Sequence, residues 1–359
     1  MARGQADSPL ETDRFEDAPH PRETLTLVGH EEAEQALLDA YRDGRLPQAV
    51  ILGGQAGIGK ATLAWRLARF VLAYPDPASP AVQKATNLDV PPDHPVTHRL
   101  NALSHGDVFL LRREWNEKTK RPFTEIRADD VRQAIHLFQQ AAGAGGYRVC
   151  IVDSAEDLNR SGANALLKLI EEPPPRSLFL IVAHRPGRVM ATLRSRCRLM
   201  LLKPLAEGEI AAIVKSLGSP WSEHDRGEIQ VAAARAHGSV HGALRLLDER
   251  GLELDRDITR LLADLPAIDW RAVHDFADQI AGREGTADYD MFLAAIVDWI
   301  DERLRREAGQ GARRLAPLAE VWEKAAEAAR ETEVLNLDRR PFILSLFADL
   351  ATAAKAFAA

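Results

Sequence analysis

The residues best suited to bind a phosphate chain lie in a glycine-rich segment early in the sequence. Residues 54–60 read GQAGIGK, which is the G-x-x-x-x-G-K pattern of a P-loop. Glycines let backbone N–H groups close around a phosphate chain, and the lysine reaches the outer phosphates. We therefore predict a nucleotide-binding site that contains the loop and the start of the following helix: Gly54, Gly57, Gly59, Lys60, Ala61 and Thr62.

The residue after the P-loop lysine departs from the usual pattern. A Ser or Thr hydroxyl normally binds Mg²⁺ at this position, and Ala61 has none. Thr62 is a poor substitute, because the next residue of a helix is rotated by about 100°. The sequence therefore argues against ordinary Mg²⁺ ligation, and it leaves ATP binding at this degenerate loop open.

A second part of the hydrolytic apparatus is altered as well. Asp153 ends the apolar run 148–153 and fits the position of the acid that supports Mg²⁺, so we include it in the nucleotide site. The glutamate that usually follows is replaced by Ser154, which cannot act as the base for an attacking water. Glu156 and Asp157 are interpreted as acids at a helix start that point elsewhere. We expect hydrolysis by this chain to be slow or absent.

The spacing of apolar residues indicates an α/β P-loop NTPase fold. Short apolar runs that alternate with helical periodicity predict a parallel sheet covered on both faces. The predicted strands are 49–52, 108–111, 148–153 and 178–183, and the predicted helices of this region lie within 24–45, 63–70, 126–142 and 161–172.

Helical patterns dominate after Pro204, and no strand is predicted beyond about residue 206. Phe292, Ile296 and Ile300 form an apolar stripe that predicts helix core, with a surface for a partner helix as the alternative. The predicted domains are a disordered lead-in (1–23), a P-loop domain (24–205), a small helical domain (206–250) and an all-α C-terminal domain (251–359).

The composition narrows the function classes. The chain has 359 residues and a net charge of −7, which argues against a protein that binds nucleic acid alone. It shows neither a membrane-spanning run nor a secretion signal, so a cytoplasmic protein is expected. Cys150 and Cys197 are expected to be reduced thiols.

His94 and His98 fall in the proline-rich stretch 75–105 without any cysteine nearby. We interpret them as loop histidines and predict no metal site and no zinc.

A basic cluster follows the strand predicted at 178–183. It contains Arg194, Arg196 and Arg198, and a charged turn would be the plain interpretation. An arginine presented at this point could instead enter a neighbour's nucleotide site, where a guanidinium stabilises charge on the transferring phosphoryl group. One arginine of this cluster is therefore a candidate for such a role.

Two segments together resemble the clamp-loader family of AAA+ proteins: residues 152–174, which contain NALLKLIEEPP, and the S-R-C triplet at 195–197. Motor subunits of that family carry Asp-Glu where this chain has Asp153 and Ser154. They also carry an arginine at the position of His241 and a four-cysteine zinc module. These departures indicate resemblance to the non-motor delta prime type of subunit of bacterial DNA polymerase III.

The resemblance implies a role in DNA replication within a hetero-oligomeric ring. The chain would be a stator with little or no ATPase of its own, inside an assembly that is a DNA-directed DNA polymerase. Its partners would be gamma/tau-type motor and delta subunits, the sliding clamp and, through the assembly, primed DNA; no membrane is implied. Residues 24–205 would form the AAA+ domain, residues 206–250 its lid and residues 251–359 the collar. Arg196 of the S-R-C triplet would be the catalytic residue, as an arginine finger in trans to a neighbouring ATP site. An ATP-hydrolysing motor subunit and a DNA-repair AAA+ ATPase remain the alternatives.

Overall fold

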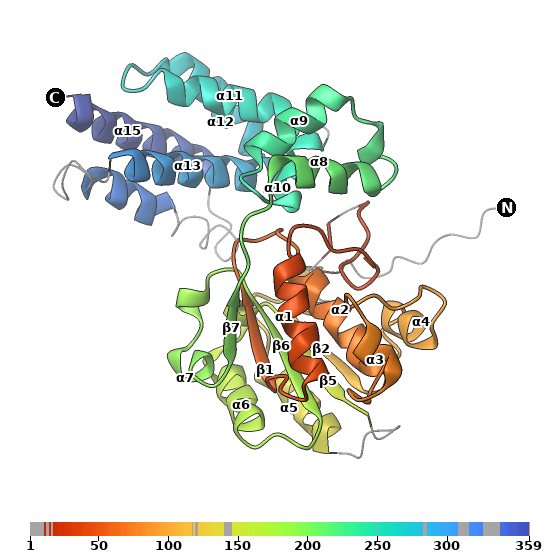
Figure 1. Ribbon diagram of the computed structural model, residues 1–359. Coiled ribbons are helices and arrows are strands. Elements are labelled where there is room, and N and C mark those ends of the chain that lie inside the picture. Colours follow the sequence, from red (N-terminus) through yellow and green to blue (C-terminus); the bar gives the residue numbers. More distant parts are fainter. Residues whose placement is uncertain are drawn as a thin grey trace. The chain divides into compact units, whose positions relative to one another are not determined.

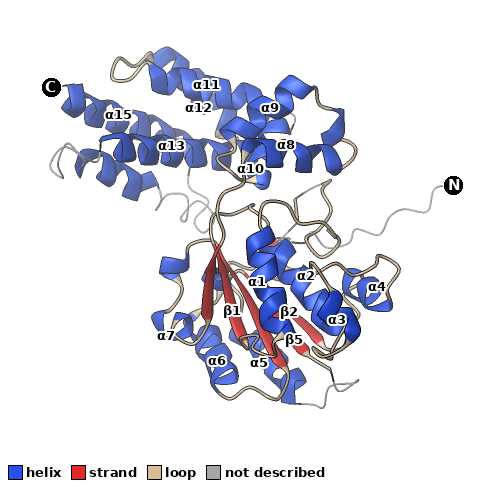
Figure 2. Ribbon diagram, viewed as in Figure 1, coloured by secondary structure: helices blue, strands red, loops and turns tan. Residues whose placement is uncertain are grey.

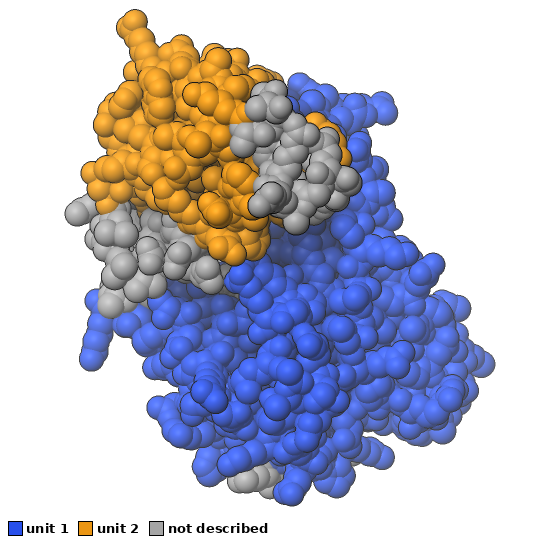
Figure 3. Space-filling view, turned by 90° about the vertical axis from the view of Figure 1, so that its left-hand side faces the viewer, with its two compact units in different colours: residues 1–244 blue, residues 245–359 orange. Residues whose placement is uncertain are grey.

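The computed structural model describes residues 11, 14–15, 17–116, 118, 121–139, 146–248, 250–282, 286–307, 316–325 and 338–358. The chain divides into two compact units, residues 1–244 and 245–359 (Figure 3). Each unit is described by itself below. The four predicted domains differ from this division and stay a prediction.

The first unit is built on a five-stranded sheet in the order β2-β5-β6-β1-β7, in which every pair is parallel (Figure 1). The strands are β1 (Ala49–Gly53), β2 (Val108–Arg112), β5 (Arg148–Asp153), β6 (Ser177–Ala183) and β7 (Arg198–Leu201). A separate antiparallel pair joins β3 (Trp115–Asn116) and β4 (Arg121–Pro122). The predicted parallel sheet is therefore confirmed.

Helices cover both faces of this sheet (Figure 2). Alternate residues of a strand point to opposite faces, so Val50 and Leu52 join one core cluster and Ile51 joins another. The first cluster includes residues of α1 (Glu31–Arg42) and α2 (Lys60–Ala73); the second includes residues of α5 (Ala128–Gln139) and α6 (Arg160–Glu171). The shorter helices are α3 (Pro80–Lys84), α4 (Pro95–Asn101), η1 (Ala155–Asp157), η2 (Pro186–Arg188) and α7 (Ala191–Arg194).

Short helices follow the sheet. We call α8 (Glu207–Ser216), η3 (Trp221–Glu223), α9 (Arg226–Arg235) and the start of α10 (Val240–Leu247) the lid helices. The side chain of Asp225 accepts a hydrogen bond from Glu228 N, and that of Glu228 accepts one from Asp225 N, which caps α9.

The second unit is helical over its described residues. It contains α11 (Gly251–Ala263), α12 (Trp270–Ile280), α13 (Thr286–Glu307), a helical segment at 316–325 and α15 (Arg339–Ala358). Phe292, Ile296 and Ile300 are fully buried in its core, which confirms the core interpretation of this stripe. Among the described helices of the whole chain, none combines the length and apolar character needed to cross a bilayer.

Three local features differ from the expectations. Strand β7 was not predicted, because it has only four residues and begins within the basic cluster, at Arg198. The proline-rich stretch contains α3 and α4, and His94 Nδ1 accepts a hydrogen bond from Val96 N at 3.2 Å as the cap of α4. Part of the helix predicted within 126–142 lies outside the described residues.

The third difference is the N-terminal segment, which was expected to be a disordered lead-in. Its described part is packed, with Ala18, His20 and Arg22 all buried. The physical reason is that Arg22 Nε donates to Asn101 O at 2.9 Å and Arg22 O accepts a hydrogen bond from Arg69, so a segment rich in charges still finds partners on the folded domain. Residues 1–10, 12–13 and 16 lie outside the described residues.

Candidate nucleotide site and the surface arginine

The predicted P-loop connects the buried strand β1 to helix α2. Gly54, Gly57 and Gly59 have positive φ angles of 144°, 75° and 99°, which residues with a side chain rarely adopt. Gly59 is the N-cap of α2, so the first backbone N–H groups of the helix lie directly behind the loop. This is the strand–loop–helix context that a phosphate cradle requires.

Lys60 begins α2 and is only 2% exposed. Its Nζ donates a hydrogen bond to Gly54 O at 2.7 Å and another to Gln55 O. Burial lowers the pKa of Lys60 to about 8, although the negative charges of Asp153 and Glu156 act in the opposite direction. Ala61 and Thr62 follow in the helix and are half-buried.

The middle of the loop contacts the lid helices. Gly57 O accepts a hydrogen bond from Val240 N at 2.8 Å. A Cβ atom at Gly57 would lie 2.3 Å from Ser239 Oγ and 2.5 Å from His241 Cβ. Glycine is therefore required here both by its φ angle and by this close approach.

His30 forms a hydrogen bond with the P-loop and was not identified from the sequence. It is buried, and its Nε2 donates to Ile58 O at 2.6 Å, because a carbonyl oxygen can only accept. His30 directly precedes α1, thirty residues from the motif that it supports. A single histidine at a helix start carries no pattern that would reveal this role.

The carboxyl ends of the parallel strands bring further polar residues to the loop. Asp153 is the last residue of β5, and His184 follows β6. Gly54 N donates to Ala183 O at 3.1 Å, so the loop is joined to the end of β6. Ser154, the replacement for the expected glutamate, donates from Oγ to Asp157 Oδ2 at 3.1 Å.

The interpretation of Glu156 as an acid that points away from the site is wrong. The turn η1 directs Glu156 towards the end of β6, where its Oε1 accepts from Arg185 N at 2.5 Å. Its Oε2 is buried and has no hydrogen-bond partner among the described residues. The carboxylate is near enough to influence the pKa of both Lys60 and His184. A 3₁₀ turn rather than an α-helix produces this geometry.

His184 is the other residue of the site that sequence reasoning missed. Burial lowers the pKa of His184, and the positive charge of Lys60 lowers it further, whereas Glu156 and Asp157 act to raise it. Its Nδ1 is buried without a hydrogen-bond partner in the described part of the chain. A polar residue directly after an apolar strand was the available signal, because ligands of parallel sheets bind at the carboxyl ends of strands.

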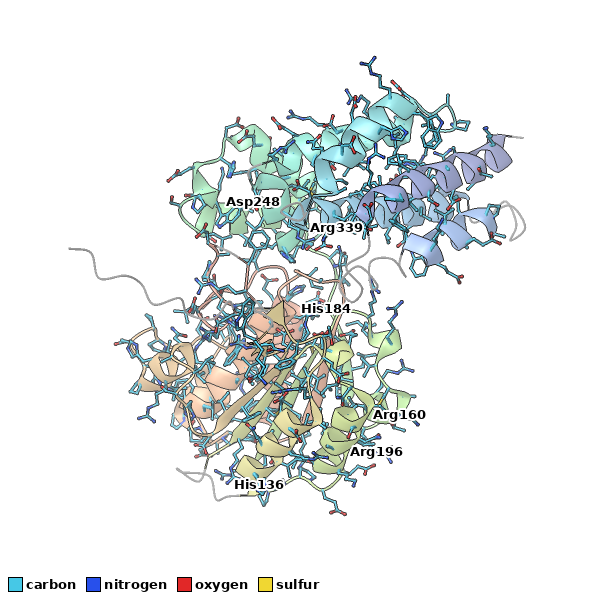
Figure 4. The ribbon with its side chains drawn as sticks, turned by 180° about the vertical axis from the view of Figure 1, so that it is seen from behind. His136, Arg160, His184, Arg196, Asp248 and Arg339 are labelled. Carbon is cyan, nitrogen blue, oxygen red and sulfur yellow. The ribbon has the colours of Figure 1, made fainter. Side chains whose placement is uncertain are left out.

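Arg196 lies at the other end of the sheet. It precedes β7, which pairs in parallel with β1 from Val50↔Arg198 to Gly53↔Leu201. The length of these strands, roughly 13 Å, therefore separates the start of β7 from the P-loop. Figure 4 shows Arg196 well away from His184.

The guanidinium of Arg196 is presented at the surface. Its side chain is 48% exposed, and its Nε lies 2.5 Å from Glu171 Oε1 at the end of α6. The two cysteines, by contrast, are shielded from solvent. Burial raises the pKa of the Cys197 thiol to about 11 and that of the Cys150 thiol to about 12. Arg196 thus cannot serve the P-loop of its own chain without a large rearrangement.

The parallel sheet, the P-loop between β1 and α2 and the acid at the end of β5 define a P-loop NTPase domain of the AAA+ type, followed by helical domains. Comparison with known proteins shows what this domain is similar to. Residues 29–206 match the family model described as "DNA polymerase III, delta subunit". This part of the chain, just under half of its length, is similar to that family of DNA polymerase III subunits.

Curated relatives carry names of the same polymerase. The chain is 36% identical over 149 residues to DNA polymerase III subunit delta' of Pseudomonas aeruginosa, covering 42% of this chain and 41% of that protein. It is 29% identical over 238 residues to subunit delta' of Escherichia coli, covering 66% and 65%. Subunit tau/gamma of Haemophilus influenzae is 27% identical over 244 residues, covering 67% and 32%. The matched region thus spans between a third and two thirds of these relatives.

Proposed function

We propose that this chain is the non-motor, or stator, subunit of a bacterial clamp loader, which helps to load the sliding clamp on primed DNA. In this role it supplies Arg196 in trans to the ATP site of a neighbouring gamma/tau-type motor subunit. A delta subunit completes the proposed ring, and the proposed location is the cytoplasm. The similarity to delta' and tau/gamma subunits of DNA polymerase III supports a place in this assembly.

One observation carries the proposal for Arg196. Its guanidinium is half-exposed at the end of the sheet that lies opposite its own P-loop. An arginine finger must be free to approach a nucleotide held by another chain, and an arginine near its own loop could not do so. The pairing with Glu171 is at the surface, where exposed ion pairs contribute only about 0–1 kcal/mol and are readily exchanged.

The altered P-loop supports the non-motor assignment. Ala61 offers no hydroxyl to Mg²⁺, and the Ser154 hydroxyl is directed to Asp157 rather than to an attacking water. The glycines and Lys60 retain the phosphate cradle. ATP binding without efficient hydrolysis is the expected behaviour of such a loop.

The experiment is the ATPase activity of a reconstituted loader, stimulated by clamp and primed DNA, with this chain either unchanged or carrying Arg196→Ala. Loss of an arginine finger lowers phosphoryl transfer by about 10³-fold or more in other systems, so hydrolysis at the neighbouring site should fall steeply. Arg198→Ala is the matched control, because it removes another exposed arginine two residues away. Gel filtration establishes that both variants assemble.

The result also separates the alternatives. Unchanged turnover with Arg196→Ala in an assembled complex would refute the trans-arginine role. Mg²⁺-dependent hydrolysis by the isolated chain that Lys60→Ala abolishes would identify a motor subunit instead. Salt-sensitive duplex binding by the isolated chain would favour a DNA-repair ATPase.

A further inference from the structure

The described residues 11, 14–15 and 17–23, which we call the N-terminal strap, are attached to the P-loop domain through polar contacts. Glu11 accepts two hydrogen bonds of 2.9 Å from Arg22 Nη1 and one of 3.1 Å from Arg112 Nη2. Arg22 Nε donates to Asn101 O at 2.9 Å, and Arg69 donates to Arg22 O. Arg22 is buried, so this end of the strap is part of the folded domain.

The other part of the strap is attached to the lid helices. The ring of Phe15 meets Trp221 edge to face at a centroid distance of 5.5 Å, and it meets His241 at 4.9 Å. The indole N–H of Trp221 donates to Asp17 O at 3.0 Å. Trp221 is 3% exposed and anchors η3 in the lid helices. Aromatic contacts and a hydrogen bond therefore join the strap to two separate points of the lid.

One of the two lid residues that contact the strap lies next to the residues that contact the P-loop. His241, which packs on Phe15, follows Val240, whose N–H is bonded to Gly57 O. Ser239 is buried directly against Gly57 and accepts a hydrogen bond from Gly242 N at 3.0 Å, which fixes the start of α10. The P-loop domain thus contacts the strap, the strap contacts the lid helices, and the lid helices contact the P-loop.

We propose that the N-terminal strap is an intramolecular lock that holds the lid helices against the P-loop. Opening of the lid requires Phe15 to leave Trp221 and His241 and requires the bond between Val240 and Gly57 to break. The lid position is then set by the chain itself rather than by a bound nucleotide. This lock does not depend on the proposed place of the chain in a clamp loader.

The test is hydrogen–deuterium exchange of the full-length chain, followed by mass spectrometry of a peptide that spans residues 237–244. In Phe15→Ala the lock loses its aromatic contact, and we expect this peptide to exchange at least tenfold faster. Peptides from β1 and β6 should keep their wild-type protection, because local opening leaves the sheet intact. Trp221→Phe keeps a ring but removes the donor to Asp17 O, so a smaller acceleration at the same peptide is expected.

Trp270→Ala is the matched control, because it removes an aromatic side chain that is 44% exposed in the second unit. It should leave the 237–244 peptide unchanged. Unchanged exchange of this peptide in Phe15→Ala would overturn the lock. Equal acceleration of the β1 and β6 peptides would overturn it too, because the strap would then only stabilise the whole unit.

Discussion

The cationic side chains at the two ends of the sheet differ in solvent exposure and in bonding partners. At the carboxyl end, Lys60 is 2% exposed and bonded to carbonyl oxygens of its own loop. At the amino end, Arg196 is 48% exposed and has a surface carboxylate as its ion-pair partner. The lysine thus bonds within its own P-loop, whereas the arginine side chain is exposed to solvent. This difference underlies the proposal that Arg196 acts on a neighbouring chain.

The largest difference between Arg196→Ala and Lys60→Ala should appear in the ATPase activity of the reconstituted loader. Arg196→Ala is expected to lower hydrolysis at the adjacent motor site by about 10³-fold. Lys60→Ala should change the stimulated turnover by no more than about twofold, because in the proposed role the P-loop of this chain does not hydrolyse ATP. Steady-state phosphate release, with assembly checked by gel filtration, measures both. A large loss with Lys60→Ala would reverse the comparison and favour a motor subunit.

The crowding at the P-loop can be tested with Gly57→Ala. The new Cβ would meet Ser239 and His241 at a φ of 75°, so backbone strain and overlap add to each other. We expect the free energy of unfolding to fall by about 3–4 kcal/mol. Gly187→Ala is the control, because nothing lies within 4 Å of a Cβ there. Equal effects of the two variants in urea denaturation would mean that the contact with the lid is loose.

The buried Lys60 should leave a signature in the pH dependence of stability. Its pKa is about 8 in the folded chain against an ordinary lysine pKa of 10.5, so the unfolded chain holds more protons between these values. Stability of the wild type should therefore rise by about 2–3 kcal/mol from pH 8 to 10.5, relative to Lys60→Met. Below pH 8 the difference between the two proteins should be constant. Denaturation curves across this range measure it, and parallel pH profiles would contradict the burial of a charged lysine.

The smallest effect is expected at the surface pair. Glu171→Ala removes the carboxylate beside Arg196, and the free energy of unfolding should change by no more than about 1 kcal/mol. Loader turnover should be retained, because the arginine is the group that acts and the glutamate only holds it at the surface. A loss of turnover comparable to that of Arg196→Ala would show that Glu171 positions the guanidinium. Thermal denaturation and the same ATPase assay provide both readouts.

Much of the fold could be predicted because its signals are local. The apolar runs at 148–153 and 178–183 are fully or almost fully buried strands, as their sequence indicates. The P-loop, the helix after it and the core stripe of α13 also follow from spacing alone. The short strand β7 could not be predicted, because its burial pattern is mostly exposed and its strand character comes from pairing with β1.

The sequence by itself determined the phosphate cradle, the missing hydroxyl at Ala61, the missing glutamate at Ser154 and the basic cluster that contains Arg196. Each of these depends on residue type at a fixed distance along the chain. Only the tertiary structure decided that Glu156 and His184 stand beside Lys60, that His30 supports the loop and that Phe15 contacts the lid helices. These contacts join separate segments, and such pairings are set by how the sheet and the lid fold around the loop rather than by any local pattern.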